Sequence, residues 1–167
     1  VGADPLAGDG CGMLVQIPHD FFVSEADKLG FALPAPGDYA VGHLFMPRDG
    51  DGFRIVTAIV EKIFAEEGLV LLGWRTVPVD PSGLGESVRP TEPQHRQIVV
   101  APGAGINDRQ EFERRLFIAR KAVSNAVYDM KDPRTEGYYP VSLSSRTLVY
   151  KGMLLATGLG DYYLDLQ

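Results

Sequence analysis

The sequence is poor in the residues from which proteins build disulfides and metal sites. Its 167 residues include one cysteine and three histidines, and none of these four lies at a spacing typical of metal ligands. A single cysteine excludes an internal disulfide and is compatible with a reducing compartment, so we expect a cytoplasmic protein. The same scarcity predicts that these residues hold neither a metal ion nor a cofactor.

Two further absences exclude classes of partner. No apolar run approaches the roughly 20 residues that cross a bilayer, and residues 1–10 lack the charged head and apolar middle of a secretory signal. Acidic residues outnumber basic residues by 22 to 16, which gives a net charge of -6. Because nucleic acid phosphates require a basic face, we expect neither a nucleic acid nor a membrane as partner.

What is present is the composition of one folded domain. Hydrophobic residues make up 45% of the chain and charged residues 23%, which is typical of globular proteins of this size. The periodicity of apolar residues predicts strands over residues 13–17, 39–46, 69–79, 94–101, 138–142 and 146–151. It predicts helices over residues 19–29 and 53–67, a third after Asp108, and a last one over residues 154–166. Strands and helices in alternation favour a layered α/β (α+β) fold.

Several elements have recognisable ends or faces. Asp49 or Asp51 can cap the second helix, and Asp108 with Glu111 three residues later has the pattern of a capping box. The strands at 13–17 and 39–46 are apolar on both sides, so we expect both of their faces to be covered.

The glycine-rich turn at residues 8–12 contains the only cysteine. Cys11 is a candidate nucleophile, because glycines on both sides let the backbone approach a ligand closely. The alternative, which a lone cysteine favours, is a small buried hydrophobe, which is how free cysteines commonly occur. Asp9, Gly10 and Gly12 are candidates for the wall of a pocket or, alternatively, for a glycine turn that holds the strand in place.

Two other clusters have alternative interpretations. A phosphate site is one interpretation of the basic residues of the third helix, and a solvated face with weak ion pairs is the other. These residues are Arg114, Arg115, Arg120 and Lys121. Residues 144–146, Ser-Ser-Arg, have the residue types of a nucleophile and an anion anchor, but no adjacent His or Lys base, which favours a turn between strands.

Three stretches together resemble the glutamine amidotransferase domain at the N-terminus of the glutamate synthase large subunit. The first is Gly-Asp-Gly-Cys-Gly-Met-Leu at 8–14, followed by Ile-Pro-His-Asp-Phe at 17–21. The second is Leu-Gly-Trp-Arg-Thr-Val-Pro-Val-Asp at 72–80. The third is Ser-Leu-Ser-Ser-Arg-Thr-Leu-Val-Tyr-Lys-Gly-Met-Leu at 142–154, which runs on to Tyr-Tyr-Leu-Asp-Leu at 162–166. They occur in the family's order over almost the whole chain.

The resemblance implies an α/β/β/α sandwich of the N-terminal-nucleophile hydrolase type. It also implies that residues 1–167 are a single partial domain, in which this sandwich is incomplete. It implies that the parent enzyme hydrolyses glutamine and passes the ammonia to a separate part that holds FMN and an iron-sulfur cluster. The implied partner of this chain is the remainder of the large subunit. Family members attack glutamine with an N-terminal cysteine whose α-amino group is the base, use an Asn-Gly pair for the oxyanion, and hold the substrate with an arginine.

The sequence departs from this family at the catalytic groups. Cys11 occupies the position of an alanine in the family's motif, and the family's nucleophile lies upstream of that motif. The sequence has no Asn-Gly pair and no Arg-Phe-Ser-Thr-Asn segment, which carries the substrate arginine in the family. The resemblance therefore implies a scaffold without a confident catalytic or substrate-binding residue.

Three functions follow as hypotheses. The first is a fragment of the glutaminase domain that is inactive alone, and the second is a non-catalytic binding or assembly module with the same layered fold. The third is a hydrolase processed so that it begins at Cys11. A layered sheet protein that lacks some of its strands exposes strand edges and apolar surface, which predicts self-association.

Overall fold

The computed structural model describes residue 4 and residues 6–167, so parts of the segment at 1–10 lie outside the described residues. The elements are β1 Cys11–Gln16, α1 His19–Leu29, β2 Ala40–Met46, α2 Gly50–Glu66, β3 Leu69–Thr76, β4 Gln94–Pro102, α3 Arg109–Met130, β5 Tyr139–Ser144, β6 Thr147–Gly152 and α4 Leu159–Tyr162. Short 3-10 turns lie at Pro81–Gly83, Arg89–Thr91, Pro133–Thr135, Ala156–Gly158 and Leu164–Leu166. This is the mixed α/β fold that the alternating periodicities predicted.

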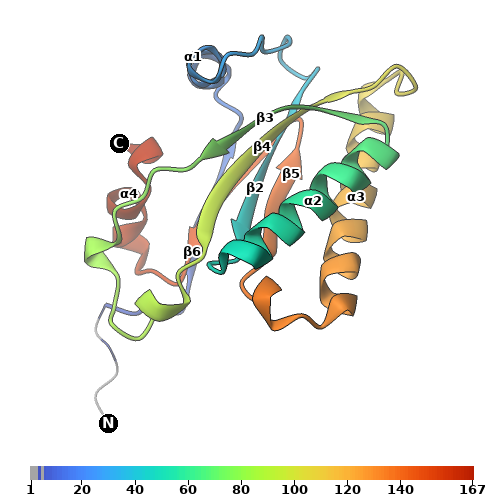
Figure 1. Cartoon of the computed structure of the whole chain (residues 1–167). Coiled ribbons are helices and arrows are strands. Elements are labelled where there is room, and N and C mark those ends of the chain that lie inside the picture. Colours follow the sequence, from blue (N-terminus) through green and yellow to red (C-terminus); the bar gives the residue numbers. More distant parts are fainter. Residues whose placement is uncertain (1–3, 5) are drawn as a thin grey trace.

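The main sheet is antiparallel and has the strand order β3-β4-β2-β5. Helices α2 and α3 lie on one face of this sheet (Figure 1). Their apolar stripes, which include Val60 and Leu116, form one core cluster with Leu44, Ile98 and Val100 of the sheet. The apolar faces of these two amphipathic helices therefore pack against the sheet.

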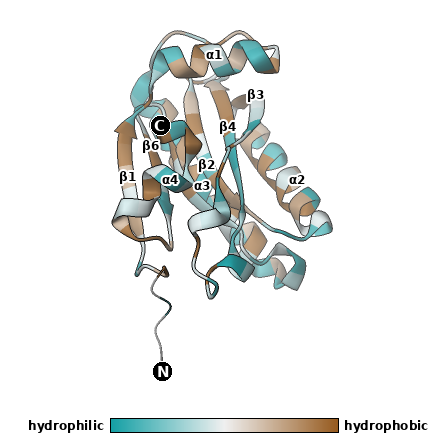
Figure 2. Cartoon of the chain, turned by 90° about the vertical axis from the view of Figure 1, so that its left-hand side faces the viewer, coloured by the Kyte–Doolittle hydropathy of each residue, from teal (hydrophilic) through white to brown (hydrophobic). Residues whose placement is uncertain are grey.

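A second core cluster lies on the other face of the main sheet. It joins Val41 and Val99 of the sheet to Phe22 of α1, to Leu148 of β6 and to Tyr163 after α4. Strands β1 and β6 pair with each other as a separate antiparallel sheet, in which Cys11 is opposite Gly152. Figure 2 shows this two-stranded sheet on the side of the molecule away from α2.

The predicted helix ends are confirmed in two cases. Asp49 caps α2, because its Oδ1 accepts hydrogen bonds from the backbone N–H groups of Asp51 and Gly52 at 2.9 and 2.8 Å. Asp108 caps α3 by accepting from the N–H of Glu111 at 2.8 Å. Each carboxylate satisfies donors that the first turn of a helix leaves unpaired.

The prediction that both faces of the first strand are covered is wrong. Adjacent residues of a strand point to opposite faces. Met13 is 39% exposed and Leu14 is 65% exposed, so both faces of this strand are partly open. Within the described part of the chain, β1 pairs only with β6 and lies at the periphery. The same prediction is confirmed for β2, which lies between two strands and between the two core clusters.

The single helix predicted over residues 154–166 is also wrong. Tertiary hydrogen bonds divide this segment into α4 and two 3-10 turns. The carbonyl of Tyr162 accepts from the N–H of Asp80 at 2.8 Å, and the N–H of Leu164 donates to the carbonyl of Pro78 at 3.2 Å. These backbone groups are then no longer available to continue a helix.

Two adjacent strands belong to different sheets. β5 pairs with β2, whereas β6, which begins after only two further residues, pairs with β1. This connection carries the chain from one sheet to the other.

No helix in the described part of the chain combines the length and the apolar character that crossing a membrane requires.

Candidate functional site

The glycine-rich turn forms part of the wall of a pocket, which we call the Cys11 pocket. Its volume is about 520 Å³. The structure brings the candidate residues 9–12 together in this lining, with residues of β2, β5 and β6 and with Met153, which follows β6. These further lining residues are Phe45, Tyr139, Val149, Lys151, Gly152 and Met153.

The glycines of this wall are required by its geometry. Gly10 has φ +110°, a backbone conformation that other residues rarely adopt. A Cβ atom on Gly12 would lie 2.9 Å from Cβ of Lys151 and 3.1 Å from the carbonyl oxygen of Tyr150. Glycine at these two positions lets the first strand turn and then lie close against β6.

The thiol of Cys11 is in a position that does not activate it. Its Sγ donates a hydrogen bond to the carbonyl oxygen of Leu155 at 3.4 Å, and the residue is only partly exposed. Burial raises the pKa of the Cys11 thiol, which disfavours the nucleophilic thiolate. The geometry therefore favours the interpretation of Cys11 as a small packed side chain.

Ser144 and Ser145 are held by a carboxylate, as expected for a connecting turn. The hydroxyl groups of both serines donate to Oε1 of Glu113 on α3, at 3.2 and 2.6 Å, and the N–H of Ser145 donates to the same oxygen at 2.6 Å. Glu113 thus fixes the turn between the two sheets to α3.

The basic cluster of α3 is partly neutralised by its own carboxylates. Arg114 forms an ion pair with Glu111, and Arg115 forms ion pairs with Glu111 at 2.8 Å and with Glu67 at 3.1 Å. These pairs fit the solvated-face interpretation better than a phosphate site.

The sequence analysis did not identify a buried ion-pair network around Arg75. Arg75 on β3 donates two hydrogen bonds to Asp165, at 2.7 and 2.6 Å, and one from Nε to Glu25 of α1 at 2.6 Å. Burial acts to lower the pKa of Arg75, but these carboxylates hold it above its ordinary value. Gln97 accepts a further bond at 3.0 Å. Arg75 and Asp165 each lie in a motif of the family resemblance. Their presence in these motifs was the feature of the sequence that could have indicated the ion pair.

A second buried polar group contains two histidines, His43 and His95, whose rings approach to 3.4 Å between Nε2 and Nδ1. Nδ1 of His43 donates to the carbonyl oxygen of Val149 at 3.0 Å. Burial, together with the nearby His95, lowers the pKa of His43 to about 3, and burial lowers the pKa of His95 to about 4. Both imidazoles are therefore neutral near pH 7.

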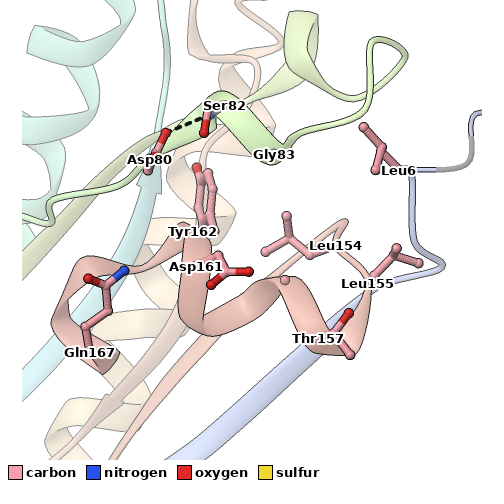
Figure 3. Close-up of a pocket in the computed structure, with 11 residues that line it drawn as sticks. Leu6, Asp80, Ser82, Gly83, Leu154, Leu155, Thr157, Asp161, Tyr162 and Gln167 are labelled. Carbon is pink, nitrogen blue, oxygen red and sulfur yellow. Dashed lines mark hydrogen bonds between the residues drawn. The ribbon is translucent and has the colours of Figure 1, made fainter.

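Another pocket, of about 530 Å³, lies between α4, the turn at Pro81–Gly83 and Leu6. Figure 3 shows the Asp161 carboxylate in this pocket, while Asp80 turns toward Ser82, whose N–H it accepts at 2.9 Å. Within the described part of the chain, no three His, Cys, Asp or Glu side chains are grouped as metal ligands would be.

Comparison with known proteins identifies the relatives of this chain. The profile of the family described as "Glutamine amidotransferases class-II" matches residues 1–167. The chain is 42% identical to the protein named "Ferredoxin-dependent glutamate synthase, chloroplastic" of Oryza sativa subsp. japonica, and 38% identical to "Glutamate synthase [NADPH] large chain" of Bacillus subtilis (strain 168). It is 37% identical to the protein of the latter name from Azospirillum brasilense.

These alignments cover 99% of this chain but only 10%, 10% and 11% of the three relatives. The chain thus spans about a tenth of the length of each of these relatives. The family match extends over every motif that carried the resemblance. The chain belongs to the class-II glutamine amidotransferases.

Proposed function

We propose that this chain is part of the glutaminase domain of a glutamate synthase, in which it supplies scaffold and pocket wall for the release of ammonia from glutamine. The observation that carries the proposal is the family match over the whole chain, shared with relatives named glutamate synthases. Glutamine is then the substrate of the parent enzyme, and the remainder of the large subunit is the partner.

The proposal assigns the reacting groups to residues outside this chain. Amide hydrolysis by a cysteine needs a thiolate, a base and donors for the oxyanion. Cys11 hydrogen-bonds Leu155 and its pKa is raised, so we propose that Asp9, Gly10 and Gly12 form part of a pocket wall and that no residue here attacks glutamine.

The iron-sulfur cluster of the proposed parent does not fit these residues. A cluster of this kind is held by several cysteine thiolates, and the sequence has one cysteine. We therefore assign the cluster, and the FMN that the resemblance places with it, to other parts of the parent.

Two of the cited relatives are bacterial in origin and one is named chloroplastic, so the cytoplasmic location stays a prediction.

We also propose that the fold is completed to an α/β/β/α sandwich. The apolar side chains of Met13 and Leu14 point to opposite faces of β1, and both are exposed. A strand that is apolar on both faces is typical of the interior of a sheet that is covered on both sides. Further strands of the parent beside β1 and a further layer over it would give these side chains that environment.

The chain alone is expected to show no glutamine hydrolysis above background. Ammonia release from glutamine by the purified chain and by its Cys11→Ala variant measures this, and the two rates should be equal. Hydrolysis that is lost in Cys11→Ala would show that the chain is a working hydrolase. Intact mass then decides whether the active species begins at Cys11, because only a processed chain has a free amine at that residue.

The chain is expected to self-associate through the exposed surface of β1. Light scattering should show oligomers that increase with concentration, and Leu14→Lys should shift them toward the monomer, because it places a charge on the exposed face. Val23→Lys, on exposed α1, is the matched control and should leave the oligomers unchanged. A monomeric wild-type chain would contradict the proposed incomplete sandwich.

A further inference from the structure

A third cavity, which we call the Glu92 pocket, adjoins the Cys11 pocket. The two cavities share Phe45, Gly152 and Met153 in their walls. The Glu92 pocket has a volume of about 270 Å³. Its lining is mostly apolar, with Phe45, Leu84, Val88, Pro93, Met153 and Leu154 around a polar end formed by Glu92, His95 and Tyr162.

Of the described residues that line this pocket, Glu92 is the only acidic one, and none is Lys or Arg. In the part of the chain that the structure describes, no Lys or Arg forms an ion pair with Glu92. Arg89, three residues away, donates instead to the carbonyl oxygen of Leu84 at 3.3 Å. Among the described residues, this carboxylate in an apolar wall therefore has no cationic partner.

The carboxylate is held in place by a chain of buried side chains. The hydroxyl of Tyr162 donates to Oε1 of Glu92 at 2.7 Å and lies 2.7 Å from Nε2 of His95. Tyr162 and His95 are each 5% exposed, so Oε1 is fixed by groups that cannot turn to solvent. Oε2 then has no hydrogen-bond partner within the described residues.

We propose that the Glu92 pocket binds a small organic cation, a primary ammonium group on an apolar body of about six to ten non-hydrogen atoms. The ammonium would donate to the carboxylate of Glu92, and the body would replace water against Leu84, Val88 and Leu154. A charge-assisted hydrogen bond in an apolar cavity is stronger than one in water, and the fixed carboxylate is ordered before binding. This site is independent of the proposed glutaminase function.

Benzylamine is the probe, with benzyl alcohol as the neutral molecule of the same shape and ammonium chloride as the cation without a body. Titration calorimetry on the full chain should show saturable binding of benzylamine, with both comparison molecules about tenfold weaker or more. In the NMR spectrum, benzylamine should shift the ring signals of His95 and Tyr162. Equal binding of benzyl alcohol, equal binding of ammonium, or no binding of benzylamine would overturn the proposal.

Two variants locate the site. Glu92→Gln keeps an oxygen for the Tyr162 hydroxyl but removes the charge, and it should weaken benzylamine binding about tenfold or more. Val88→Phe should block the cavity while leaving the carboxylate in place. Glu86→Gln and Asp161→Asn remove a charge outside this lining and should leave binding unchanged. Unchanged binding in Glu92→Gln, or loss of binding in Asp161→Asn, would place the amine elsewhere and refute the assignment.

Discussion

Replacing Arg75 with methionine is expected to lower the free energy of unfolding by about 3–5 kcal/mol, which is the usual effect of removing one partner of a buried ion pair. The side chains of Arg75 and Asp165 are only 6% and 4% exposed. Without the guanidinium, Asp165 keeps only the hydroxyl of Tyr150, which donates at 2.9 Å. Urea unfolding of wild type and variant measures the difference.

Two further variants separate loss of the pair from loss of packing. The double variant Arg75→Met with Asp165→Leu removes both charges and is expected to recover part of the stability, since an apolar pair leaves no buried charge. Arg54→Met removes an exposed ion pair with Asp51 and should change the free energy of unfolding by less than about 1 kcal/mol. A value for Arg75→Met as small as that for Arg54→Met would show that the network contributes little.

Lowering the pH from about 7 to about 5 is expected to destabilise the fold by about 2 kcal/mol for each of the two buried histidines. In the unfolded chain histidine takes up a proton near pH 6.5, whereas in the folded chain the pKa of His43 is about 3 and that of His95 about 4. The unfolded state therefore binds more protons in this range. A folded-state pKa below the unfolded one means that stability is present above pH 6.5 and is lost as the pH falls.

Urea unfolding at several pH values between about 7 and about 5 measures this loss, above the range in which most carboxylates titrate. The slope of the free energy of unfolding against pH measures how many more protons the unfolded state binds than the folded state. His43→Gln should lower this number by about one, whatever its effect on stability near pH 7. A slope of zero in the wild type, or an unchanged slope in His43→Gln, would contradict neutral, buried imidazoles.

Local signals in the sequence were sufficient for the first three helices and for most strand positions, but not for the segment at 154–166. The capping residues Asp49 and Asp108 and the apolar stripes of α2 and α3 appear in the structure as predicted. These features depend on residues three or four positions apart, so a sequence read in short windows contains them. The exposed faces of β1 could not be predicted in this way, because coverage depends on which elements pack beside a strand.

The candidate site was predictable in part. That residues 9–12 share one pocket wall follows from their adjacency, but the rest of the lining comes from β2, β5 and β6 and from Met153. The interpretation of Cys11 depended on a hydrogen bond to Leu155, which lies 144 residues further along the chain. Periodicity and spacing contain no information about partners at that distance.

The sequence by itself determined the family, through the order of its motifs. It also determined that an Asn-Gly pair and a second cysteine are absent from it. Only the tertiary structure decided that Arg75 binds Asp165, that His43 meets His95, and that Glu92 lies in the mostly apolar lining of a pocket. The physical reason is that local propensity and periodicity are set by neighbouring residues, whereas burial and charge pairing are set by elements that meet only when the chain is folded.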